Sequence, residues 1–133
     1  KSIILVDDSL VRGTTCLKIV KMLYDAGVKE VHVRIACPEI RYPDFYGVDM
    51  PTKKELLAHG RSNEEMRNYI NAKTLKFLSL SGLYKAIGFE ERNKTYPQLS
   101  DHYFTGEYPV KPTDLLGEGK ITQLSLLSSK SNN

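Results

Sequence analysis

The sequence predicts an α/β fold with a parallel sheet, and three patterns support this prediction. The short apolar run Ile3-Ile4-Leu5-Val6 is typical of a parallel strand that is covered on both faces. An amphipathic helical pattern follows, with apolar residues at three-residue steps from Leu17 to Ala26. Alternating apolar residues from 31 to 35 indicate a second strand. Strands joined through one helix are usually parallel and adjacent, so we predict a β-α-β unit.

The residues between these elements support the same boundaries. The first strand stops at Asp7, Gly27 follows the helix as a C-terminal cap, and Pro38 ends the second strand. Residues 38 to 51, "PEIRYPDFYGVDMP", hold three prolines and a glycine among aromatic residues. This composition indicates an ordered excursion of the chain rather than a linker, with the aromatic residues as packing.

The remaining elements are short. Two capping boxes, Thr52-x-x-Glu55 and Ser62-x-x-Glu65, predict the starts of two helices. The stretch "TLKFLSL", residues 74 to 80, predicts a third strand, and "SGLYKAIG", residues 81 to 88, a small helix. Periodicity is lost after Tyr96. We therefore expect one domain over residues 1–92 and an irregular C-terminal extension over residues 93–133, with a disordered tail.

Composition excludes several classes of function. A chain of 133 residues with 41% apolar and 26% charged residues has a globular composition. Its net charge of +3 is spread along the chain without a dense basic block, so no nucleic acid partner is expected. No apolar stretch approaches the roughly 18 residues of a membrane span, so none is expected to cross a membrane. Cys16 and Cys37 form neither a disulfide framework nor a metal pair, which favours a cytoplasmic location.

The stretch "VDDSLVRGTT" lies between the first strand and the first helix, where parallel sheets bind ligands. Gly13 permits close approach of the backbone to a phosphate, and Thr14 and Thr15 add hydroxyl donors at the helix N-terminus. Asp7 and Asp8 would repel a bare phosphate, but carboxylates accept hydrogen bonds from sugar hydroxyls and coordinate divalent cations. A sugar phosphate bound with Mg²⁺ would suit both the loop with its threonines and the two carboxylates. The candidate binding residues are Asp7, Asp8, Ser9, Leu10, Val11, Arg12, Gly13, Thr14 and Thr15, with Asp7 and Asp8 as metal ligands.

Several of these residues also have a structural interpretation. Arg12 is equally a surface charge or a phosphate-side group, and Thr14 or Thr15 could cap the helix. Cys16 and Cys37 are interpreted as small buried residues rather than nucleophiles. The three histidines, His32, His59 and His102, show no metal-ligand spacing, and none is assigned catalysis.

The stretch "IILVDDSLVRGTT" resembles the phosphoribosyl diphosphate signature of type I phosphoribosyltransferases. Its flank "RYPDFYGVDMPTKKELLA" is similar to the phosphoribosyltransferase half of the glutamine phosphoribosylpyrophosphate amidotransferases, and the similarity extends over most of residues 1–110. The resemblance implies part of the type I parallel sheet with flanking helices. It also implies a fragment of an enzyme that makes 5-phosphoribosylamine from phosphoribosyl diphosphate and glutamine, the first step of purine biosynthesis. By this resemblance Asp7 and Asp8 engage the ribose hydroxyls and magnesium, and Ser9 to Thr15 hold the 5-phosphate.

Two departures from that family qualify the resemblance. Some members carry an iron-sulfur cluster, with one cysteine in a "PCFYG" context and others before "FTG", whereas this sequence has Asp44 in "PDFYG" and "SDHYFTGEYP". We therefore expect Mg²⁺ but no iron-sulfur cluster. The family's glutaminase domain, diphosphate loop and lid are not in this chain. We expect the chain alone to be inactive, to bind phosphoribosyl diphosphate and purine nucleotides, and to work with a glutaminase domain in a homo-oligomer.

Two other classes of protein remain as alternatives. A response-regulator receiver domain also begins with a strand and paired acids for Mg²⁺, and Asp49 would then be the phosphoacceptor. Against this, Asp49 follows the loop-like "DFYGV", and a receiver has no use for Gly-Thr-Thr after the acids. A non-catalytic subunit that keeps the phosphoribosyl fold and senses nucleotides is the second alternative.

Overall fold

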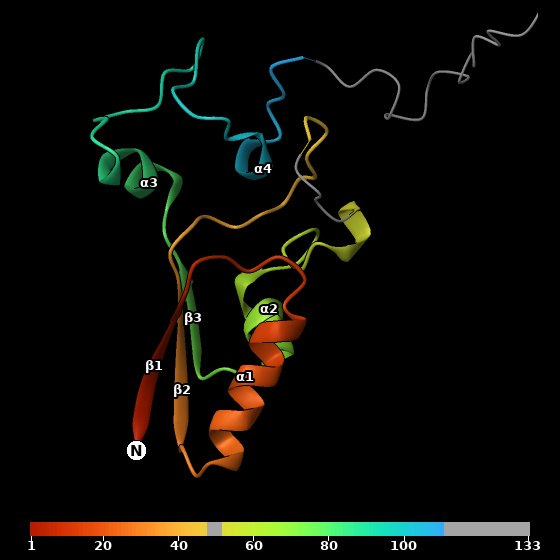
Figure 1. The fold of residues 1–133 in the computed structure, drawn as a ribbon, viewed down its shortest axis with the longest axis vertical. Helices are drawn as coiled ribbons and strands as arrows, with labels where there is room; N and C mark the ends of the chain where they lie inside the picture. Colours follow the sequence, from red (N-terminus) through yellow and green to blue (C-terminus); the bar gives the residue numbers. More distant parts are fainter. Residues whose placement is uncertain (48–51, 111–133) are drawn as a thin grey trace, which may run out of the picture.

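A computed structural model describes residues 1–47 and 52–110, and its centre is one three-stranded parallel sheet (Figure 1). The strands are β1 (Ser2–Asp7), β2 (Glu30–Ile35) and β3 (Thr74–Phe77), in the spatial order β1-β2-β3. Asp7 lies opposite Ile35, and Ile35 lies opposite Phe77, so the carboxyl ends of all three strands meet at one edge of the sheet. The predicted α/β class and the β-α-β unit are confirmed.

Helix α1 (Thr14–Asp25) connects β1 to β2 and packs on the sheet through Cys16 and Val20. Its end is closed by Gly27, whose φ of +87° is a left-handed conformation that favours glycine. The N–H groups of Gly27 and Val28 donate to the carbonyls of Tyr24 and Leu23, the pairing of a Schellman motif. The predicted cap is therefore confirmed.

Both predicted capping boxes start a helix. Thr52 precedes the 3₁₀-helix η1 (Lys53–Glu55), and Ser62 precedes α2 (Asn63–Tyr69). In the second box the Glu65 carboxylate accepts the Ser62 N–H at 2.7 Å, while the Ser62 hydroxyl accepts the Glu65 N–H at 3.2 Å. Helix α2 then enters the core through Met66, and its C-cap residue Ile70 is buried beside it in the same cluster. The helix start that the capping box predicts is therefore followed by a helix that packs into the core.

The third strand is shorter than predicted, since β3 ends at Phe77 instead of residue 80. The cause is Ser79, whose hydroxyl accepts the Gly82 N–H at 3.0 Å and caps α3 (Leu80–Ala86). A further helix, α4 (His102–Thr105), was not predicted, because four residues are too few for a periodic pattern.

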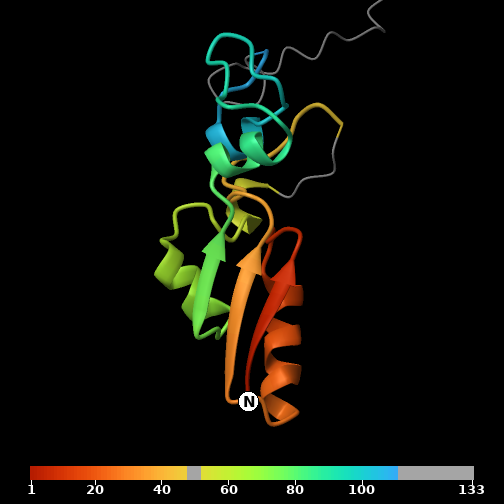
Figure 2. The ribbon, with the colours of Figure 1, turned by 90° about the vertical axis from the view of Figure 1, so that its left-hand side faces the viewer.

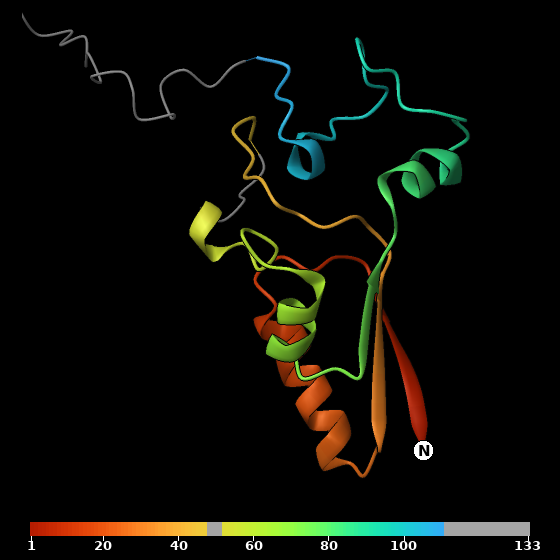
Figure 3. The ribbon, with the colours of Figure 1, turned by 180° about the vertical axis from the view of Figure 1, so that it is seen from behind.

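Helices α1 and α2 lie on the same face of the sheet, and Figure 2 looks onto the opposite face, with Figure 3 showing the arrangement from behind. On β1 the residues Ile4 and Val6 are 66% and 68% exposed, whereas Ile3 and Leu5 pack against the core. The prediction that this strand is covered on both faces is wrong within the described residues, where no other element packs on the second face.

Three other sequence predictions concern the chain as a whole. In residues 1–47 and 52–110 no helix has the length and apolar character needed to cross a membrane. The division of the chain at residue 92 stays a prediction. The predicted disordered tail falls on residues 111–133, outside the described residues.

Candidate phosphate-binding site

The predicted binding residues come together at the carboxyl end of β1. A cavity of about 310 Å³ lies there, between the end of the strand and the first turn of α1. One continuous run of chain, residues 7–16, lines it, and this run contains all nine candidate residues together with Cys16. The first N–H groups of a helix have no partner within the helix, so a cavity at the start of α1 suits an anion.

Gly13 determines the shape of this loop. Its φ of +78° is left-handed, and a Cβ atom built on it would lie 2.7 Å from Leu57 Cδ2 and 3.0 Å from Tyr69 Cε1. A side chain is therefore excluded both by conformation and by space. Gly13 is also the N-cap of α1, so Thr14 and Thr15 are the first helical residues rather than caps. Both threonines line the cavity and are exposed.

The two acidic residues are held at the rim of the cavity by local hydrogen bonds. The Asp7 carboxylate accepts the Asp8 N–H at 3.0 Å, and the Asp8 carboxylate accepts the Ser9 hydroxyl at 3.0 Å. No cluster of three or more metal-ligating side chains occurs in the part of the chain that the structure describes. Mg²⁺ is commonly held by one or two carboxylates together with substrate oxygens and water, so this oxygen-donor pair fits that ion.

The Arg12 side chain is paired with an acidic residue outside the loop, and its role toward phosphate stays a prediction. Its guanidinium forms an ion pair with Glu55 at 3.3 Å, and Glu55 also accepts the Thr52 hydroxyl at 2.9 Å. The pKa of Glu55 is lowered, first by its hydrogen bonds from Thr52 and then by Arg12. The pair ties the loop to η1, and the sequence showed Glu55 only as part of a capping box.

Cys16 lies under the loop and is predicted to be unreactive. Burial, and after it the charge of Asp7, raises the pKa of its thiol to about 11. At pH 8 only about one thiol in a thousand is then ionised, so alkylation by iodoacetamide should be at least ~100-fold slower than for free cysteine. The measurement is mass spectrometry of a Cys37→Ser variant, with the urea-unfolded chain as control. Rapid labelling of the folded chain would contradict this account.

A second polar feature lies away from the loop. Asp44 and His102 are 7% and 2% exposed, and His102 Nε2 lies 2.6 Å from the Asp44 carboxylate. His102 Nδ1 has no hydrogen-bond partner among the described residues. The His102 ring packs against the ring of Tyr103, with 4.0 Å between the ring centroids. The sequence indicated no role for this histidine, because only the fold brings it to Asp44. The absence of an iron-sulfur cluster stays a prediction.

A parallel α/β sheet with this loop at the end of its first strand defines a domain of the phosphoribosyltransferase type. The chain is 53% identical over 130 residues to the amidophosphoribosyltransferase of Rhizobium etli, covering 97% of this chain and 26% of that protein. It is 51% identical over 110 residues to the Staphylococcus aureus Mu50 amidophosphoribosyltransferase, covering 83% of this chain and 22% of that protein. No family model matches the chain.

Solved structures agree with these relatives. Glutamine phosphoribosylpyrophosphate amidotransferase from B. subtilis, complexed with ADP and GMP, matches 81% of this chain and 24% of its own, with a TM-score of 0.72 and 49% identity. A structure described as the allosteric regulatory enzyme of purine biosynthesis matches 82% of this chain and 23% of its own, with a TM-score of 0.73 and 49% identity. The chain is homologous to a region of amidophosphoribosyltransferase and spans about a quarter of the length of the relatives it matches.

Proposed function

We propose that this chain supplies the ribose 5-phosphate site of an amidophosphoribosyltransferase that makes phosphoribosylamine in the first step of purine biosynthesis. The observation that supports the proposal is the single cavity lined by residues 7–16 at the carboxyl end of β1. In this proposal the loop amides from Ser9 to Gly13 bind the 5-phosphate, with the hydroxyls of Thr14 and Thr15. Asp7 and Asp8 accept hydrogen bonds from the ribose hydroxyls.

The chemistry of the reaction assigns these groups a positioning role. Ammonia attacks C1 of phosphoribosyl diphosphate as diphosphate leaves, so positive charge develops at the ribose in the transition state. Fixing the 5-phosphate holds C1 in line for attack, and no covalent step is required of this chain. Magnesium held by Asp7 and Asp8 would balance the charge of the diphosphate. Purine nucleotides, which also carry a ribose 5-phosphate, would compete for the loop, in keeping with the ADP and GMP of the B. subtilis complex.

The remaining features of the proposal concern the whole enzyme. We propose a cytoplasmic enzyme whose glutaminase domain supplies the ammonia and whose subunits form a homo-oligomer. Asp49, the phosphoacceptor required by the receiver alternative, lies outside the described residues. Stable modification of Asp49 by acetyl phosphate would favour that alternative.

Asp8→Asn tests the role of the acids. We expect affinity for ribose 5-phosphate to fall roughly tenfold with Mg²⁺ present and by clearly less without it, because the change removes one charged ligand of the metal, while the amide oxygen still accepts from the ribose hydroxyls and the phosphate loop stays intact. Titration calorimetry with ribose 5-phosphate across magnesium concentrations gives the measurement. Asp25→Asn, the same substitution at the far end of α1, is the control. Equal affinities of Asp8→Asn and wild type at every magnesium concentration would refute the assignment.

A further inference from the structure

The phosphate loop rests on a segment that the sequence did not connect with it. Residues 56–58, here called the backing segment, consist of Leu56, Leu57 and Ala58, which are 0%, 2% and 1% exposed. The Leu57 N–H donates to the Val11 carbonyl at 2.8 Å, and the Leu57 side chain fills the space next to Gly13. The position of the backing segment therefore sets the position of the loop backbone.

Two arginines hold the carbonyl groups of the backing segment. Arg61 Nη1 donates to the Leu57 carbonyl at 3.1 Å, and Arg41 Nη1 donates to the Ala58 carbonyl at 2.8 Å. Arg61 lies only four residues from Leu57, whereas Arg41 comes from the excursion that follows β2. Arg41 therefore joins the backing segment to the excursion after β2, in addition to the bond between Leu57 and Val11.

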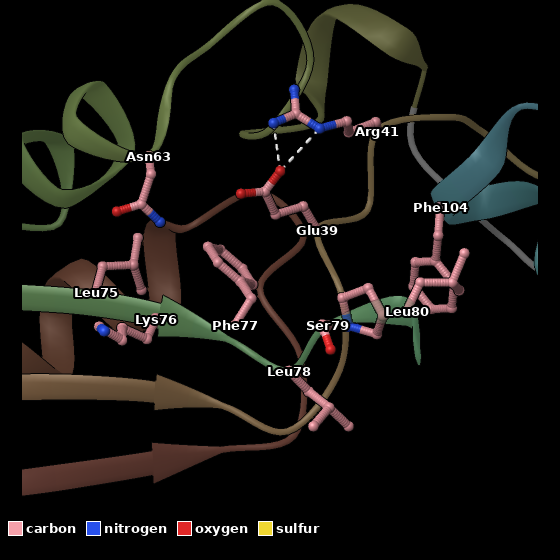
Figure 4. Close-up of a pocket in the computed structure, with 11 residues that line it drawn as sticks. Glu39, Arg41, Asn63, Leu75, Lys76, Phe77, Leu78, Ser79, Leu80 and Phe104 are labelled. Carbon is pink, nitrogen blue, oxygen red and sulfur yellow. Dashed lines mark hydrogen bonds and ion pairs between the residues drawn. The ribbon is translucent and has the colours of Figure 1, made fainter. Parts of the chain in front are cut away.

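Arg41 is itself oriented from two sides. The Glu39 carboxylate accepts its Nε at 2.8 Å and also its Nη2, as Figure 4 shows at the edge of a separate cavity of about 490 Å³. The Arg41 backbone N–H donates to the Tyr103 carbonyl of α4 at 2.9 Å. The planar guanidinium can bond Glu39 and Ala58 at once, which the compact ammonium of a lysine cannot reproduce.

We infer that Arg41 is a positioning residue for the phosphate loop, acting through the backing segment and oriented by Glu39. The inference rests on the proposed function for its ligand, ribose 5-phosphate. The hydrogen bonds of the Arg41 guanidinium in the described part of the chain go to Glu39 and to the carbonyls of Ala58 and Arg61, and none of these residues lines the phosphate cavity. The effect of Arg41 on binding passes through the Leu57 amide and the Leu57 side chain.

The test uses the full chain with Arg41→Met. We expect affinity for ribose 5-phosphate to fall about tenfold, and hydrogen exchange at the Leu57 amide to speed up by a similar factor. Arg67→Met is the matched control, because Arg67 also pairs with a glutamate and donates to a backbone carbonyl, that of Ala72, at 3.2 Å. Its side chain is 32% exposed, against 35% for Arg41. This control should leave both readouts unchanged.

Arg41→Lys separates positioning from simple attraction of the phosphate by charge. It keeps the positive charge, so a purely electrostatic role predicts wild-type affinity, whereas positioning predicts that most of the loss remains. This variant also serves if Arg41→Met does not fold. Unchanged exchange at Leu57, or full affinity in Arg41→Lys, would overturn the inference. Failure of wild type to bind ribose 5-phosphate would instead overturn the proposed function, since the exchange measurement needs no ligand.

Discussion

Gly13→Ala should reduce affinity for ribose 5-phosphate by roughly 100-fold and lower the free energy of unfolding by about 2–4 kcal/mol. The left-handed φ of +78° costs any L-residue energy, and the new methyl group would lie 2.7 Å from Leu57 Cδ2. To relieve this close contact, either the Leu57 side chain or the loop has to move. Because the Leu57 N–H also holds Val11, either movement displaces the loop amides from the phosphate.

Gly27→Ala is the matched control for that experiment. Gly27 has a similar left-handed φ of +87°, but nothing lies within 4 Å of the position of its Cβ. The Gly27→Ala variant should lose about 1 kcal/mol of stability from conformational strain alone and bind ribose 5-phosphate with the affinity of wild type. Calorimetric titration and urea unfolding of both variants provide the comparison. Equal losses of affinity in the two variants would show that the contact with Leu57 does not shape the site.

Asp101→Asn should destabilise the chain by about 3–5 kcal/mol at pH 7, since it removes one partner from a buried ion pair. Asp101 is 2% exposed and accepts hydrogen bonds from Arg92 Nε at 2.5 Å and from the Tyr84 hydroxyl at 2.9 Å. Tyr84 is fully buried. The substitution leaves the Arg92 guanidinium, which is 15% exposed, without its buried counter-charge, and among the described residues only the exposed Glu107 still pairs with it, at 2.6 Å.

The effect should depend on pH in a defined direction. Burial by itself would raise the pKa of Asp101, but hydrogen bonds from Arg92 and Tyr84 and the charge of Arg92 outweigh it, and the pKa lies below its ordinary value of 3.8. A carboxyl with a depressed pKa in the folded state contributes its full stability above the unfolded value. That contribution is lost as the pH falls below 3.8 towards the folded value. The difference between wild type and Asp101→Asn should therefore shrink below about pH 4.

Urea unfolding between pH 3 and 7 measures this difference. Asp25→Asn is the control, because Asp25 forms a 2.8 Å ion pair with Lys21 but its side chain is 64% exposed. An exposed pair of this kind contributes at most about 0.5 kcal/mol, so the control should stay close to wild type at every pH. A loss in Asp101→Asn no larger than in the control would mean that the buried network of Asp101, Arg92 and Tyr84 does not stabilise the fold.

Much of the fold and the candidate site could be predicted from local sequence. The β-branched run before Asp7, the helical stripe ending at Gly27 and the two capping boxes correspond to β1, α1, η1 and α2. Each depends on residues within a few positions of one another, so the pattern is visible in one dimension. The run from Asp7 to Thr15 belongs to the same class, since one strand, one turn and one helix start place all nine residues around a single cavity.

Only the tertiary structure determined which distant residues support that site. The contact of Leu57 with Gly13, the bond of Arg41 to Ala58 and the burial of Asp44 against His102 join residues that lie 44, 17 and 58 positions apart. The exposure of Ile4 and Val6 likewise follows from where the helices pack and not from the apolar run itself. Propensity, capping and turn chemistry act between near neighbours, whereas packing selects partners by proximity in space. That residues 7–15 surround one cavity was therefore predictable from the sequence, and the residues that hold this loop in place were not.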